Sequence, residues 1–211
     1  MQHETVQIHT FWRSGAKATH KHRSQVPEVT DCLPRNAAEF RQIADELCDR
    51  AQRVATDQLH PLLQRVDLVK LSQRHEFLEA FRCSLEREIA QKIVLWLPCV
   101  KVVYKFDASR KKRLEEWDNT IHLLVLVPQL IPLIKELGTM LDVAFLTSLK
   151  RLPWSRFQDS KFVIEIQQVT PGEMRHGVCY GAMFFSYYAT PSQVWPLGCS
   201  ATPVIGDSPS R

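Results

Sequence analysis

Glycine is scarce in this chain. Only 7 of its 211 residues are glycine, and that is about 3% against a usual ~7%. Between positions 16 and 171 the sequence contains a single one, Gly138. A Rossmann fingerprint and a Walker loop both need several glycines so that the backbone can approach a phosphate. The scarcity therefore excludes both nucleotide-binding loops from this long stretch.

Paired cysteines and clustered metal ligands are also missing. The six cysteines form no CxxC pair, and no tight group of cysteine and histidine occurs. Cys48 and Cys83 fall on expected helix faces, where a free cysteine behaves as a small apolar residue. The N-terminus has no apolar segment of the signal-peptide kind. We therefore expect free thiols in a cytoplasmic protein, with no metal and no cofactor.

No apolar run is long enough for a membrane span. The longest, 121–134, is interrupted by His122, Pro128, Gln129 and Pro132. A membrane helix needs ~20 predominantly apolar residues. We expect this run to be buried core instead.

The charge is modest overall but concentrated locally. The formal net charge is +4. Hydrophobic residues make up 45% of the chain, which is an ordinary composition for a globular protein. The segment 101–113 carries six basic residues against one acidic residue, Asp107. Such a segment is either an ordinary solvated surface or a contact surface for an anionic partner.

The first part of the chain predicts two amphipathic helices. Residues 1–34 are polar and basic without sustained periodicity, and we expect a mobile arm. Asn36 and Glu39 form a capping-box pattern, and apolar residues then recur at helical spacing until Pro61 ends the helix near Leu59. A second helix is expected from Ser72 to Leu97. Close succession predicts an antiparallel pair over 35–97.

From Pro98 onwards the pattern changes to mixed strands and helices. β-Branched and aromatic residues predict strands at 100–106 and 161–169. The run 120–127 fits a strand or a helix, and we favour a strand. Apolar spacing predicts helices at 109–117 and 129–152. A Pro-Gly turn over 170–177 and a second strand over 178–188 would make a hairpin.

These elements define an α+β fold. The expected units are the arm 1–34, the helical pair 35–97, an α+β half 98–190 with a C-terminal hairpin, and a proline-rich tail 191–211. No internal repeat is visible.

The segment 130–188 resembles winged-helix DNA-binding proteins. Leu137 and Leu141 would pack a first helix, Asp142-Val143 would form the turn, and 145–152 would be the recognition helix. The hairpin 161–188 would be the wing. Two departures stand beside the resemblance: the recognition segment is short, and the turn lacks glycine. The alternative is one continuous helix over 129–152, because the apolar spacing passes through the supposed turn unbroken.

The resemblance implies a set of nucleic-acid contacts. Polar residues of the recognition helix would read bases, while the basic residues of the wing and of the charged segment would contact phosphates. The set is Lys111, Lys112, Arg113, Thr147, Ser148, Lys150, Arg151, Lys161 and Arg175.

A catalytic site is a weaker alternative. His176 and Cys179 place an imidazole near a thiol, a combination that suits a nucleophile. Three residues of separation does not ensure contact, and no third group that would orient the imidazole can be identified. The sequence therefore assigns no catalytic residue.

Aromatic residues favour a protein-contact function. Tyr and Trp often anchor protein interfaces, and the candidates here are Trp154, Tyr187, Tyr188 and Trp195. The leading hypothesis is a non-catalytic cytoplasmic regulatory or assembly protein that binds another protein or its own copies. A DNA-binding regulator is the first alternative, and an enzyme near His176 and Cys179 is the second.

Overall fold

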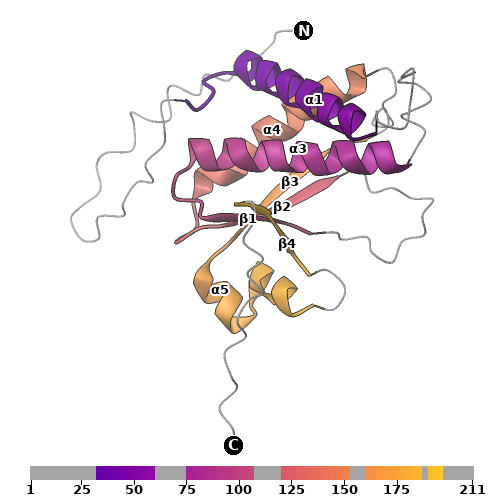
Figure 1. The fold of residues 1–211 in the computed structure, drawn as a ribbon. Coiled ribbons are helices and arrows are strands. Elements are labelled where there is room, and N and C mark those ends of the chain that lie inside the picture. The colour runs from indigo at the N-terminus through magenta and orange to yellow at the C-terminus, as the bar shows by residue number, and fades with distance from the viewer. Residues whose placement is uncertain (1–31, 60–74, 107–119, 153–159, 187–189, 197–211) are drawn as a thin grey trace, which may run out of the picture.

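The protein is described by a computed structural model that covers residues 32–59, 75–106, 120–152, 160–186 and 190–196. Three long helices lie on one face of a four-stranded sheet, and a short helical lobe lies on the other (Figure 1). The elements confirm the α+β class expected from the sequence. Across the described residues, none of the helices combines the length and the apolar character that crossing a membrane requires.

Helix α1 (Ala37–Leu59) begins and ends where the sequence predicts. The Asn36 side chain accepts hydrogen bonds from the backbone of Ala38 and Glu39, both at 3.0 Å. Glu39 reaches back to the backbone N–H of Arg35 at 2.7 Å, one residue earlier than in a standard capping box. Because these local contacts satisfy free amides, they fix the start of the helix.

Helix α3 (His75–Trp96) pairs with α1. The two helices run in broadly opposite directions (Figure 1). Phe40 of α1 meets Trp96 of α3 edge to face, with ring centroids 6.1 Å apart. The expected helical pair is therefore present, although its first turn at Ser72 lies outside the described residues.

The sheet has the strand order β3-β2-β1-β4. Strands β1 (Val102–Lys105) and β2 (Ile121–Leu126) are antiparallel, and β2 runs parallel to β3 (Ile164–Val169). The 120–127 run is thus a strand, as favoured above. Strand β4 (Ser192–Trp195) pairs with the free side of β1.

Helix α4 (Pro132–Arg151) connects β2 to β3 and packs against β3. Its middle residue Asp142 accepts hydrogen bonds from the backbone N–H groups of Val163 and Ile164, at 2.7 and 2.9 Å. Such charge-assisted bonds are stronger than neutral ones. These two bonds hold the start of β3 against the middle of α4.

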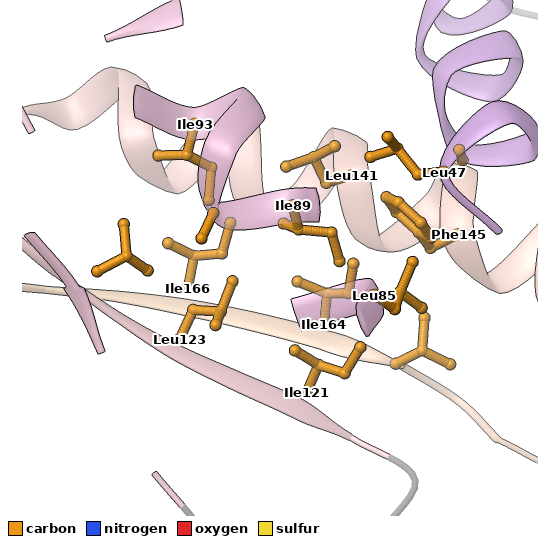
Figure 2. Close-up of a cluster of buried hydrophobic side chains, with 14 of the residues drawn as sticks. Leu47, Leu85, Ile89, Ile93, Ile121, Leu123, Leu141, Phe145, Ile164 and Ile166 are labelled. Carbon is orange, nitrogen blue, oxygen red and sulfur yellow. The ribbon is translucent and has the colours of Figure 1, made fainter. Parts of the chain in front are cut away.

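The main core lies between the helices and the sheet (Figure 2). Alternate residues of the strands point into it. Helices α1, α3 and α4 contribute the side chains that face them. The side chains drawn at its centre are Leu47, Leu85, Ile89, Ile93, Ile121, Leu123, Leu141, Phe145, Ile164 and Ile166.

The structure contradicts the helix-turn-helix considered within 130–152 and confirms the single helix that the apolar spacing predicts over 129–152. α4 is one continuous helix through Asp142 and Val143, so the supposed turn does not exist. Asp142 instead serves as an acceptor for β3. The alternative interpretation, a single helix, is the one the structure supports.

The hairpin and wing expected over 161–188 are also wrong. β3 pairs in parallel with β2 and not with a following strand. Residues after it form helix α5 (Pro171–His176) and the 3-10 helix η3 (Cys179–Phe185). The expected tail 191–211 likewise begins with a strand, because β4 finds an unpaired edge on β1.

Candidate functional site: the α5–η3 lobe

A short lobe, residues 171–185, covers the sheet face opposite the long helices (Figure 1). Its first helix, α5, starts with a capping box. Thr170 Oγ1 accepts the N–H of Glu173 at 3.2 Å, and the Glu173 carboxylate accepts the N–H of Thr170 at 2.8 Å. Pro171 fits the first turn, where its missing N–H costs nothing.

Two glycines set the path of the lobe. Gly177 ends α5 with a left-handed φ of 61°, a conformation that glycine adopts without a Cβ penalty. Gly181 packs so tightly on α5 that a Cβ there would overlap the Glu173 carbonyl and lie 2.7 Å from Met174 N. The lobe is therefore one rigid unit whose shape depends on local backbone packing.

The inner side of the lobe rests on a small apolar cluster. Phe106, Leu124 and Val169 of the sheet are buried there, and Phe184 of η3 meets Tyr104 edge to face at 4.9 Å. Burial in this cluster raises the pKa of Tyr104, because the phenolate is disfavoured away from water. These contacts hold the lobe against the sheet.

The lobe exposes large apolar side chains to solvent. Val178, Tyr180 and Phe185 have exposed fractions of 48%, 38% and 55%. The Phe185 ring lies within 3.3 Å of where a Cβ on Gly177 would be, and it therefore lies beside the residue that precedes Val178. Three exposed apolar side chains thus gather on a unit of 15 residues, 171–185.

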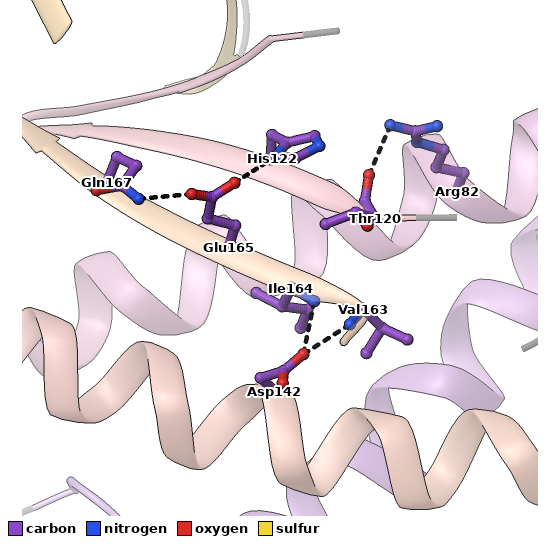
Figure 3. A network of polar contacts seen from close by, with 8 residues as sticks. All are labelled: Arg82, Thr120, His122, Asp142, Val163, Ile164, Glu165 and Gln167. Carbon is purple, nitrogen blue, oxygen red and sulfur yellow. Dashed lines mark hydrogen bonds and ion pairs between the residues drawn. The ribbon is translucent and has the colours of Figure 1, made fainter. Parts of the chain in front are cut away.

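Polar side chains of β2 and β3 form a small network on the sheet (Figure 3). His122 of β2 faces Glu165 of β3 in the strand register, and its Nδ1 lies 2.8 Å from Glu165 Oε2. Gln167 Nε2 donates to the other Glu165 oxygen at 2.6 Å. Both carboxylate oxygens are therefore engaged.

Tyr180 couples the lobe to this polar group. Burial raises the pKa of Tyr180, and the nearby Glu165 carboxylate and Cys179 thiol raise it further. A negative charge disfavours ionisation of a neighbouring phenol. The Tyr180 phenol therefore stays neutral to a higher pH than an unperturbed tyrosine.

A second polar cluster lies between α3 and the sheet. Glu86 is 2% exposed, and Arg82 Nε lies 3.0 Å from its Oε1. Lys105 Nζ lies 3.0 Å from Glu86 Oε2, an ion pair that lacks hydrogen-bond geometry at that oxygen. Burial lowers the pKa of Lys105, but Glu86 and Cys83 together outweigh it, so the pKa is raised overall.

This second cluster is structural. Arg82 also donates to the Thr120 carbonyl at 3.1 Å (Figure 3), so α3 binds the end of β1 and the entry of β2 at once. The two cations compensate a carboxylate that would be costly to bury alone.

The structure does not bring the expected nucleic-acid contacts together. Thr147 donates its hydroxyl to the Val143 carbonyl, and Ser148 is buried and donates to the Ala144 carbonyl. Lys150 and Arg151 lie at the end of α4, where Arg151 pairs loosely with Asp45 at 3.8 Å. Arg175 lies across the sheet on α5.

The remaining residues of that set divide between the surface and the undescribed segments. Lys161 is exposed just before β3. Lys111, Lys112 and Arg113 lie outside the described residues.

One of the four expected protein-contact aromatics is described. Trp195 is half-buried and packs against the main core, so much of its ring serves the fold. Trp154, Tyr187 and Tyr188 lie outside the described residues.

His176 and Cys179 are both exposed on the lobe. Within the described part of the chain, no hydrogen bond or ion pair joins them. Cys179 has a left-handed φ of 49°, unusual for a residue with a side chain. The same described residues contain no group of three histidine, cysteine or acidic side chains that could hold a metal ion.

Comparison with models of known protein families, with curated proteins and with solved structures finds no match for this chain. The lobe must therefore be interpreted from its own geometry.

Sequence reasoning missed the lobe although its signals are present. Thr170 and Glu173 have capping-box spacing, Pro171 occupies the first helical position, and Gly177 stands where a helix ends. The His122–Glu165 pair has no such signal, because 43 residues separate its members. Val178 and Phe185 were expected in a strand, whereas the structure places them at the two ends of η3, where both are exposed.

Proposed function

We propose that the chain is a non-catalytic protein-contact module whose α5–η3 lobe binds a partner protein. The observation that carries the proposal is the exposure of Val178, Tyr180 and Phe185 on one rigid unit. Interface centres are enriched in aromatic residues and arginine. A lobe that is fixed in advance loses little conformational entropy when it binds.

The charges of the lobe indicate the chemistry of the partner. Arg175 and His176 are exposed in the last turn of α5, while the only acid of that helix, Glu173, is engaged in the capping box. The exposed surface is thus apolar with a basic side. It fits a protein segment that presents apolar side chains flanked by acidic ones, because complementary charges guide association.

A cytoplasmic location is part of this proposal. The described cysteines, Cys32, Cys48, Cys83, Cys99 and Cys179, are all free thiols. Free thiols in this number are typical of a reducing compartment.

Site-specific photo-crosslinking tests the proposal. A photoreactive amino acid at position 178 should crosslink a defined protein in cells, whereas the same amino acid at the similarly exposed position Leu95 on α3 should not. The captured protein is then purified and its affinity for the unmodified chain is measured by calorimetry.

Variants decide the outcome with the purified partner. Phe185→Ser should weaken binding about 30-fold, the ~2 kcal/mol typical of an interface anchor. Leu95→Ser is the matched control and should leave the Kd unchanged. Equal crosslinking from both positions, or an unchanged Kd for Phe185→Ser and Arg175→Glu, would contradict the proposal.

Thiol chemistry at Cys179 is a second candidate function. Its left-handed φ is a strained conformation of the kind found at active sites, and its thiol is exposed. A nucleophilic Cys179 should react with iodoacetamide much faster than the exposed Cys32, as followed by peptide mass spectrometry. Equal rates for the two thiols would remove this candidate.

A further inference from the structure

The outer edge of β3 presents backbone groups to which no described strand pairs. β3 is the last strand of the sheet, and its described neighbour is β2. The carbonyls of Val163 and Val169 accept bonds from residues at the two ends of β2. In a parallel ladder, alternate residues face the neighbour, so Ile164, Ile166 and Gln168 direct their N–H and C=O groups outward.

The fold uses only one of these outward groups. Asp142 accepts the Ile164 N–H. The single charged side chain of the strand, Glu165, is bound to His122 and Gln167 on the sheet face. Apart from the Asp142 carboxylate at Ile164, the described part of this edge lacks the outward charges, prolines and bulges that usually prevent strand pairing.

Exposed apolar residues lie at both ends of this edge. Phe162 (55% exposed) directly precedes the residues that Asp142 holds, and Val143 (58% exposed) directly follows Asp142. At the other end, the Gln168 side chain makes two hydrogen bonds with the backbone of Ile131, which follows Leu130 (61% exposed). Among the described residues, Phe162, Val143 and Leu130 are thus exposed large hydrophobic residues next in sequence to groups that contact β3.

We propose that β3 pairs antiparallel with β3 of a second copy of this chain, around a two-fold axis at Ile166. In that register the Ile166 N–H groups donate to each other's carbonyls across the axis. The Gln168 N–H of each copy donates to the partner's Ile164 carbonyl. All of these groups face outward and are unused by the described fold, and the two sheets become one continuous sheet.

The side chains suit this register. Glu165 faces the partner's Gln167, whereas a register centred on residue 165 would place two carboxylates opposite each other, which is destabilising. Phe162 comes opposite the partner's Thr170, at the end of the edge where Leu130 lies. A two-fold contact uses the same patch twice. The pairing of Phe162 with the partner's Leu130 therefore occurs at both ends of the paired strands.

This inference goes beyond the proposed function, because it uses the sheet edge and not the lobe. It is tested with the full chain by sedimentation velocity over a range of concentrations. The expected result is a reversible species with twice the 24.4 kDa mass of the chain. A monomer at every concentration would overturn the proposal.

Charge variants test the register. Phe162→Glu and Leu130→Lys should each raise the dimer Kd about tenfold or more, because each places a charge at an apolar contact. The double variant should restore dimerisation, since opposite charges then meet at both ends. Leu95→Lys, at a similarly exposed position on α3, should have no effect.

A backbone variant tests the edge itself. Gln168→Pro removes an N–H that points away from β2, so the β2–β3 ladder keeps its bonds while the dimer loses one bond per copy. The variant also loses the two side-chain bonds to Ile131, so Gln168→Ala, which loses only those side-chain bonds, is the matched control and should leave the dimer Kd unchanged. Circular dichroism checks that the variant folds. A dimer or a larger assembly that is insensitive to Gln168→Pro and to both charge variants would overturn the proposal.

Discussion

On the helix-covered face of the sheet, side chains such as Leu123 and Ile166 enter a large apolar core built by three long helices. On the lobe-covered face, the buried apolar residues that the structure describes are Phe106, Leu124 and Val169, beside the polar pair His122 and Glu165. The helix side is held by the amount of apolar surface it removes from water. The lobe is held against the sheet by a small apolar cluster, while glycine placement and capping bonds set the shape of the lobe itself.

This difference separates stability from recognition. A core packed between helices and a sheet tolerates hydrophobic substitutions of similar volume. Many different sequences could therefore form the helix-covered side. The lobe depends on single atoms, such as the missing Cβ of Gly181. A protein surface that must match a partner benefits from this kind of definition, because its shape is set before binding.

The largest contrast is expected from truncating one phenylalanine on each face. Phe145→Ala removes a fully buried ring from the helix side and should lower the free energy of unfolding by about 3–5 kcal/mol. Phe184→Ala, on the half-buried lobe side, should cost clearly less. Urea denaturation followed by circular dichroism measures both, and equal losses would show that the two faces do not differ as described.

Next in size is Gly181→Ala. The added methyl group would overlap the Glu173 carbonyl, and overpacking of this kind costs roughly 1–3 kcal/mol. Gly172→Ala is the matched control, since its Cβ would meet only Thr170 Oγ1 at 3.8 Å. Hydrogen exchange should rise in the lobe and not in α1 for Gly181→Ala. An unaffected lobe would mean that its path is not fixed by this contact.

Removing the cap of α5 should have a smaller effect. Thr170→Ala deletes the acceptor of the Glu173 N–H, a change worth ~1 kcal/mol. Thr139→Ala on α4 is the control, because its hydroxyl only bonds the carbonyl of Lys135 on an exposed surface. Amide exchange within α5 distinguishes the two variants. Faster exchange in both, or in neither, would contradict a specific role for the cap.

How far the sequence predicts this fold depends on how local each signal is. The limits of α1 follow from Asn36 and Pro61, which act within one turn. The parallel pairing of β2 with β3 joins residues such as His122 and Glu165 across a whole helix, and no nearby residue announces it. The parallel pairing depends on how α4 packs against β3. The apolar spacing of the sequence predicts that α4 is a helix but does not predict where it packs.

The candidate site was predicted in part for the same reason. Arg175 and Cys179 stand out as residue types, and they do lie on the exposed lobe. Their setting was wrong because aromatic residues in 178–188 favour a strand by propensity. The backbone geometry at Gly177 and Gly181 favours the helical turns instead, and it outweighs the weak strand propensity of the aromatic residues.

The smallest expected effect concerns alkaline pH. Burial raises the pKa of Tyr104 above its usual value of 10.0. The neutral phenol is therefore favoured in the folded state, and this contribution is complete below pH ~10. It is lost as the pH rises through the raised value, so the lobe side should weaken there while the helix core does not.

Tyr104→Phe isolates this contribution, because it keeps the edge-to-face contact with Phe184 and removes the ionisable hydroxyl. Urea denaturation at pH 9 and pH 11, read with lobe hydrogen exchange, should show a smaller loss for the variant than for the unmodified chain. Lysines and other tyrosines titrate equally in both proteins, so the difference reports Tyr104. If the two proteins lose the same stability, the phenol is not buried by the lobe, and the lobe-covered face is more open to water than its contacts with Phe184 imply.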